Sequence, residues 1–174
     1  MSLARHRVSS TLSKKMIDVS KYSKRLLRLA QRYSIPKEKV EIVSDVAKRS
    51  IELGWEKEGD DTNKERMAKV KHDIDPPHIL LRSKIRLEAG KDIVDDTFLS
   101  EKKKDVVRPT DSDHWTFLKF LLLHEIGHSE LNHANRTLST EASETEKIEL
   151  KILNDVEADE WALVLIAEGI PSTV

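Results

Sequence analysis

Residues 114–135 read HWTFLKFLLLHEIGHSELNHAN, and the rest of the chain is interpreted around them. Leucine, phenylalanine and isoleucine recur at helical spacing through this stretch, and no proline interrupts it. The pattern predicts one helix over residues 114–135 with an apolar face. Several possible N-cap residues precede it in the polar run Thr-Asp-Ser-Asp at 110–113.

The same helix carries His124-Glu125-Ile126-Gly127-His128, which is an H-E-x-x-H motif. Positions i and i+4 share one face of a helix, so His124 and His128 can reach the same metal ion. Glu125 is then placed to act as the general base on a metal-bound water. The chain has no cysteine, so any metal must be held by histidine or carboxylate ligands. We expect one zinc ion at this motif, although such a ligand set does not exclude other divalent ions.

A catalytic zinc site needs a third protein ligand and keeps a further position open for water. The extended motif H-E-x-x-H-x-x-G-x-x-H is excluded, because Leu131 and Ala134 occupy its glycine and third histidine positions. His133 follows His128 by five residues, which turns it off the ligand face of a helix. We therefore interpret His133 as a helix-end or loop residue that contacts substrate at most.

A second helix, predicted over residues 146–168, supplies the remaining acids. At about 100° per residue, Asp155 and Asp159 lie within about 40° of each other on its apolar side. Unpaired carboxylates are costly there, so we expect Asp155 to be the third ligand and Asp159 to hydrogen-bond a ligand imidazole. Glu157 lies about 160° from that pair and is the alternative third ligand. Ordinary salt bridges are the other interpretation of Asp155 and Asp159.

The rest of the chain predicts an α+β fold that is mostly helical, with a small β-sheet or hairpin flanking the H-E-x-x-H helix. Helices are expected over 16–33, 36–51 and 64–71, and strands over 79–87 and 92–99. Residues 1–72 are expected to form a helical N-terminal segment with a basic first helix, and residues 73–174 the metal-binding core. Together they are expected to make one compact unit.

Charge is unevenly distributed, since residues 1–34 carry nine Lys or Arg and one acid, Asp18. Such a segment fits nucleic acid or an acidic partner, but no base-reading motif or interleaved aromatic supports that interpretation over a solvated helix face. The first residues lack the apolar core of a secretory signal. The longest apolar run, 117–123, is too short to cross a bilayer. We therefore expect a cytoplasmic protein without a membrane partner.

The two helices together resemble the ImmA/IrrE metallopeptidases, which pair a helix of type H-E-x-G-H with a later helix of type E-x-x-A-[N/D]-x-F-A. The resemblance covers residues 115–171, where the second pattern meets DVEADEWA at 155–162. Its usual glutamate ligand falls on Asp155, one methylene shorter, and its second acid falls on Asp159. Lit-type phage-exclusion proteases are also similar.

This resemblance implies a zincin-like hydrolase with a helical shell that carries out limited proteolysis of an intracellular protein, often a repressor. The function expected is thus a zinc-dependent endopeptidase. His114, His133 and Arg136 are the nearby candidates for stabilising the oxyanion. The alternative is a regulatory, nucleic-acid-binding or partner-binding protein with a structural or decayed metal site.

Overall fold

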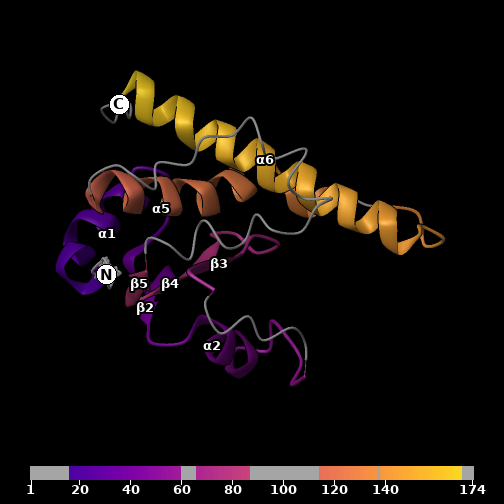
Figure 1. Ribbon diagram of the computed structural model, residues 1–174, viewed down its shortest axis with the longest axis horizontal. Coiled ribbons are helices and arrows are strands. Elements are labelled where there is room, and N and C mark those ends of the chain that lie inside the picture. The colour runs from indigo at the N-terminus through magenta and orange to yellow at the C-terminus, as the bar shows by residue number, and fades with distance from the viewer. Residues whose placement is uncertain (1–15, 60–65, 87–113, 137, 170–174) are drawn as a thin grey trace, which may run out of the picture.

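The computed structural model describes residues 16–59, 66–86, 114–136 and 138–169 (Figure 1). Its helices are α1 (Ser23–Gln31), α2 (Val46–Glu52), α5 (His114–Glu130) and α6 (Glu144–Glu168). Its strands are β1 (Met16–Asp18), β2 (Val40–Val43), β3 (Ala68–Lys71), β4 (His78–Arg82) and β5 (Lys84–Arg86). Short 3₁₀ turns occupy Val19–Tyr22, Lys37–Lys39 and His133–Asn135. Helical residues outnumber strand residues in this part of the chain, which confirms the mostly helical α+β prediction.

The strands form two small sheets that meet at one bend. β4 lies between β2, which is parallel to it, and β3, which is antiparallel. β5 pairs antiparallel with β1 in the second sheet. Ser83 alone separates β4 from β5; its N–H donates to Val43, and its carbonyl accepts from Val19. Each sheet therefore combines strands from the expected N-terminal segment (1–72) with a strand from the expected core (73–174).

Helix α5 lies between α6 and the three-stranded sheet, and α2 lies on the other side of that sheet (Figure 1). It is buried on nearly every side, because it packs against both α6 and β3. Its large apolar side chains belong to the main core cluster: Phe117, Leu118, Phe120, Leu121, Leu122, Leu123 and Ile126. A helix that is apolar around most of its circumference occupies such a central position.

Three segments predicted as helix are strands, so the prediction is wrong there. They are Met16–Asp18, Val40–Val43 and Ala68–Lys71. Each pairs with β4 or β5, and this tertiary pairing outweighs the weak local preference for helix. The strand predicted over 92–99 and the N-cap candidates at 110–113 lie outside the described residues.

The central helix also ends earlier than predicted, at Glu130 instead of residue 135. Asn132 has a positive φ of 55°, a left-handed conformation that stops a helix and that asparagine tolerates. The chain then turns into the 3₁₀ segment His133–Asn135.

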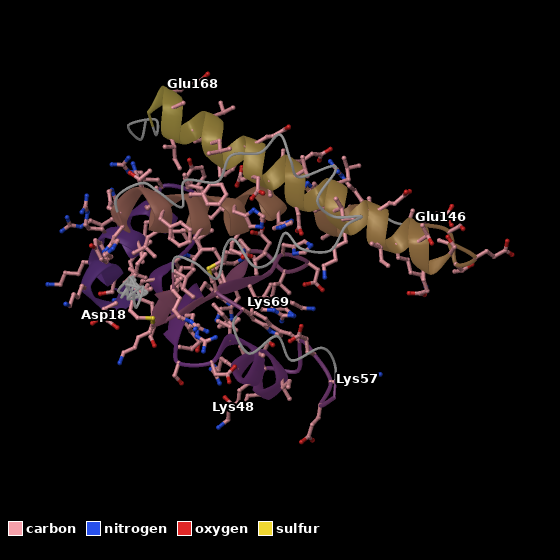
Figure 2. All side chains as sticks on the ribbon, in the orientation of Figure 1. Asp18, Lys48, Lys57, Lys69, Glu146 and Glu168 are labelled. Atoms are coloured by element: carbon pink, nitrogen blue, oxygen red, sulfur yellow. The ribbon has the colours of Figure 1, made fainter. Side chains whose placement is uncertain are left out.

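Helix α6 begins at Glu144, after an N-cap at Ser143 whose side chain forms a capping box with Glu146. It ends at Glu168, and the C-cap Gly169 has a φ of 83°. The helix predicted over 146–168 is therefore confirmed. Figure 2 shows Glu146 and Glu168 at its two ends. None of the described helices has an apolar stretch long enough to span a membrane.

Candidate metal centre

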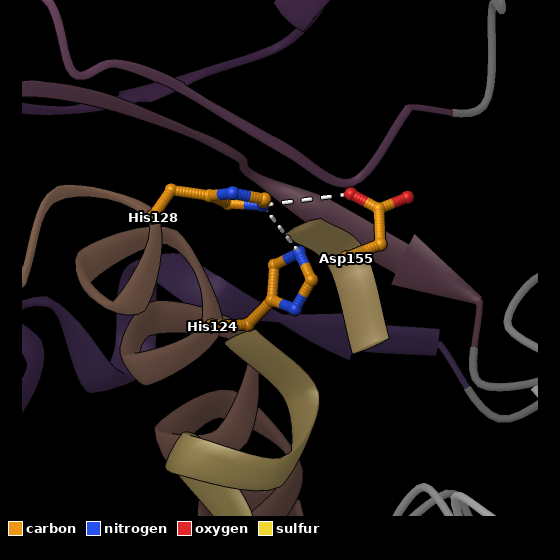
Figure 3. A group of neighbouring side chains, drawn as sticks. All are labelled: His124, His128 and Asp155. Atoms are coloured by element: carbon orange, nitrogen blue, oxygen red, sulfur yellow. Dashed lines mark hydrogen bonds and ion pairs between the residues drawn. The ribbon is translucent and has the colours of Figure 1, made fainter. Parts of the chain in front are cut away.

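His124 and His128 project from α5 toward Asp155 on α6 (Figure 3). The two Nε2 atoms lie 3.2 Å apart. His128 Nε2 lies 3.5 Å from Asp155 Oδ1. One ligand atom from each of the three residues lies within 4.8 Å of the other two. A tetrahedral zinc ion with bonds of about 2.0–2.1 Å holds its ligand atoms about 3.3–3.4 Å apart, so the donor set and the two measured edges fit zinc.

Asp159 contacts the imidazole of His124 through Nδ1, the ring nitrogen that does not face the proposed ion. Its side chain is only 1% exposed. Its Oδ1 lies 2.7 Å from Nδ1 of His124. A carboxylate accepts this hydrogen bond, so Nδ1 carries the proton and Nε2 presents its lone pair to the proposed ion. Burial opposes a charged ring, but the Asp159 hydrogen bond and the nearby carboxylates Glu125 and Asp155 outweigh it and raise the pKa of His124.

Glu125 is buried, with 7% of its surface exposed, and it lines the same cavity as the two histidines. Burial is the main cause that raises its pKa, to about 7, and His124 opposes the shift. A carboxyl group with a pKa near neutrality can both take up and release a proton under ordinary conditions. This property is the one that a general base and later proton donor requires.

His133 and Glu157 lie on the far side of His128, away from the proposed ion. His133 Nδ1 is 2.8 Å from His128 Nδ1, and its Nε2 is 3.2 Å from Glu157 Oε2. Arg136 holds the same Glu157 oxygen at 2.6 Å. Glu157 is thus occupied elsewhere, and the geometry favours Asp155 as the third ligand. The His133 side chain is 0% exposed and is not among the residues that line the cavity.

A cavity of about 650 Å³ opens at the cluster between α5, β3 and the first half of α6. Its lining includes several basic side chains: Arg66, Lys69, Arg136, Lys147 and Lys151. Glu56 also lines the cavity and contacts Lys69, which lies on β3 (Figure 2), and Arg66 at 2.6 Å. Burial would raise the pKa of Glu56, but hydrogen bonds from Lys69, Ser50 and Arg66 lower it to about 2. The wall of the cavity therefore carries charged groups of both signs among apolar side chains.

His72 also lines the cavity, although no sequence motif singles it out. Its ring lies 5.7 Å from that of His128 between centroids, at an interplanar angle of 26°. Its Nδ1 is buried without a hydrogen-bond partner among the described residues. Burial lowers the pKa of His72, which favours the neutral ring. His72 directly follows β3, and only the pairing of β3 with β4 brings it to the site; no local motif marks it.

Two of the residues that the sequence suggested for stabilising the oxyanion, Arg136 and His114, lie at different distances from the cluster. Arg136 lines the cavity, while His114 begins α5, ten residues before His124 and thus about 15 Å along the helix axis.

No family model, curated protein or solved structure matches this chain significantly. The geometry of the site itself therefore carries the functional argument.

Proposed function

We propose that this protein is a zinc-dependent endopeptidase. The observation that carries the proposal is the convergence of His124 and His128 on one helix with Asp155 on another, at separations of 3.2 and 3.5 Å. Zinc bound by these residues would supply the Lewis acidity that lowers the pKa of a water molecule and polarises a peptide carbonyl. Three protein ligands would leave a further position open, as catalytic zinc sites require.

Glu125 is the proposed general base. It takes a proton from the attacking water and returns it to the nitrogen of the leaving amine. Its pKa of about 7 suits both steps. His72 is the proposed oxyanion-stabilising residue, because its neutral ring can donate one N–H and it lines the cavity beside His128.

The proposed substrate is a protein chain that enters the cavity in an extended form. The cavity is open, and its wall combines charged side chains with apolar ones, which suits a peptide with its polar backbone and mixed side chains. The resemblance to ImmA/IrrE peptidases adds the expectation of a cytoplasmic regulatory protein, such as a repressor, as the substrate.

Two measurements on the purified protein test the proposal. Metal analysis should find about one zinc per chain, because the residues that the structure describes contain one such set of three ligands. Wild-type and Glu125→Gln forms should then be compared in cells, with new protein N-termini identified by mass spectrometry. We expect cleavage products with the wild type alone, and equal zinc in both forms. Glu130→Gln, on the exposed end of the same helix, is the control and should cleave normally.

The alternative is a binding protein with a structural metal, and α1 is the feature that favours it. This helix exposes Lys24, Arg25 and Arg28 and contains no acidic residue, and its C-cap Arg32 is exposed as well. Zinc binding without any cleavage, together with loss of a partner after charge reversal on α1, would support that alternative. Zinc content near zero would exclude both.

A further inference from the structure

We propose that His133, Glu157 and Arg136 form a hydrogen-bonded relay that fixes the tautomer and orientation of His128 for metal binding. The proposal rests on the proposed metal site and extends it. His124 has a direct carboxylate partner in Asp159, but no carboxylate lies next to Nδ1 of His128 in the described structure. His133 takes that place and passes the interaction on to an acid one step further away.

The relay begins at Arg136, which fixes the charge state of Glu157. The guanidinium lies 2.6 Å from Glu157 Oε2 and also donates to the Asn154 side chain at 3.0 Å. An arginine is always charged, so the carboxylate beside it is held in its ionised form. An ionised carboxylate can only accept hydrogen bonds, so Nε2 of His133 must donate to Glu157.

The direction of the remaining hydrogen bond follows from this donation. A neutral His133 ring that carries its proton on Nε2 has only a lone pair on Nδ1. Nδ1 of His128, 2.8 Å away, must therefore donate to it. A neutral His128 with its proton on Nδ1 presents the Nε2 lone pair to the proposed ion. The opposite direction would place a proton on Nε2 of His128 and remove the ligand.

A local backbone feature makes the relay possible. On a continuous helix, a residue five positions after His128 would lie about 140° around the axis and face away from it. The left-handed Asn132 ends the helix, and the 3₁₀ turn returns His133 beneath the ring of His128. The side chain of His133 is fully buried there, so it contributes a fixed acceptor with little freedom to move.

Helix α6 would then serve the metal site with three acids in three ways. Asp155 contacts the ion directly, Asp159 orients His124, and Glu157 orients His128 through His133. A histidine between ligand and acid has a longer reach than a carboxylate alone. This explains how Glu157 can support the site although it lies on a different face of α6 from Asp155 and Asp159.

The first test measures zinc affinity of the full chain by competition with a chromophoric chelator. Outer partners of metal ligands typically change metal affinity about 10–100-fold, so His133→Phe should weaken binding within that range. His133→Asn places an amide oxygen near the position of Nδ1 and should retain most of the affinity. Glu157→Ala, at a partly exposed position, is a second variant that leaves the core intact and should weaken binding toward the lower end of that range. His114→Ala is the matched histidine control and should bind as the wild type does.

The second test reads the tautomer directly in the metal-free protein by long-range ¹H–¹⁵N NMR of the imidazoles. We expect His128 to be the Nδ1–H tautomer in the wild type and a mixture of tautomers in His133→Phe, with His124 unchanged. A simple loss of packing would not produce this selective change. Equal zinc affinity and an unchanged His128 tautomer in His133→Phe and Glu157→Ala would overturn the relay while leaving the zinc site intact. Absence of zinc binding by the wild type would overturn the metal proposal itself, and the NMR result would still decide the hydrogen-bond direction.

Discussion

Gly127 lies between the two proposed histidine ligands and faces Ala158 and Trp161 on α6. A Cβ atom added there would lie 3.1 Å from Cε3 of Trp161 and 3.4 Å from Cα of Ala158. Carbon atoms prefer separations of about 3.5–4.0 Å, so the first contact is too short by several tenths of an ångström. Gly127→Ala therefore tests whether this glycine is needed for the approach of α6 to α5.

Two opposing effects set the size of the change. Alanine is better than glycine inside a helix by about 0.8–1.0 kcal/mol. Overpacking a filled core typically costs about 1–3 kcal/mol. The contact with Ala158 is to backbone, and the indole of Trp161 packs edge-on against Tyr33 at 5.6 Å, so neither neighbour can turn aside freely. We expect a net loss of about 1 kcal/mol, which corresponds to a fall of about 2–4 °C in Tm for a chain of this size.

The same displacement of α6 should also weaken metal binding. Asp155 lies on α6 one turn before Ala158, so a shift of α6 moves this ligand away from the histidine pair on α5. We expect zinc affinity to fall several-fold in Gly127→Ala, measured by chelator competition, with melting followed by circular dichroism in the metal-free protein.

A double-mutant cycle with Trp161→Leu isolates the contact, because leucine lacks the Cε3 atom. The two substitutions together should cost less than the sum of their separate effects. A Gly127→Ala protein as stable as the wild type, with unchanged zinc affinity and no coupling to Trp161, would refute the reasoning.

Three further outcomes are expected. Asp155→Ala should abolish retention of zinc through gel filtration. Asp155→Glu should retain zinc, because the longer acid can still supply a carboxylate oxygen. Retention of zinc by Asp155→Ala would point to a different third ligand. Asp159→Asn should weaken zinc binding about 10–100-fold by chelator competition, since it replaces the carboxylate behind His124 with a weaker acceptor. Glu56 has its pKa lowered from 4.5 to about 2, so its ionised form stabilises the fold above about pH 4.5 and that contribution is lost as the pH falls toward 2. Urea denaturation across this interval should therefore show a shallower pH dependence for Glu56→Gln than for the wild type, and identical slopes would contradict the ion-pair assignment.

The sequence was sufficient to predict α5, α6 and the acids at the site, because their positions follow from helical periodicity. Asp155 and Asp159 were selected by their common face on α6, and both lie beside the histidine pair. Such patterns need only local information, since each turn of a helix repeats the same geometry.

The predicted strand over 79–87 coincides with β4 and β5, but β1, β2, β3 and the relay depend on contacts between distant residues and were missed. Val40–Val43 pairs with β4 across more than thirty intervening residues, and nothing in its own four residues specifies that partner. The prediction for His133 extends a helix through Asn132 and so turns His133 away from His128. The left-handed conformation of Asn132 ends the helix, and His133 lies beside His128 instead. His72 reaches the cavity through a different pairing, that of β3 with β4.

The proposed ligands come from two separate helices, so the bound ion would act as a noncovalent cross-link between them. Binding restricted to the folded protein adds stability that grows with the concentration of free metal, by about 2.7 kcal/mol when that concentration is 100 times Kd. Helix α6 would then be held less tightly in a cell short of zinc. Susceptibility to proteolysis would rise in the same conditions that would remove the proposed activity, so the lifetime of this protein and that activity would both follow the metal supply.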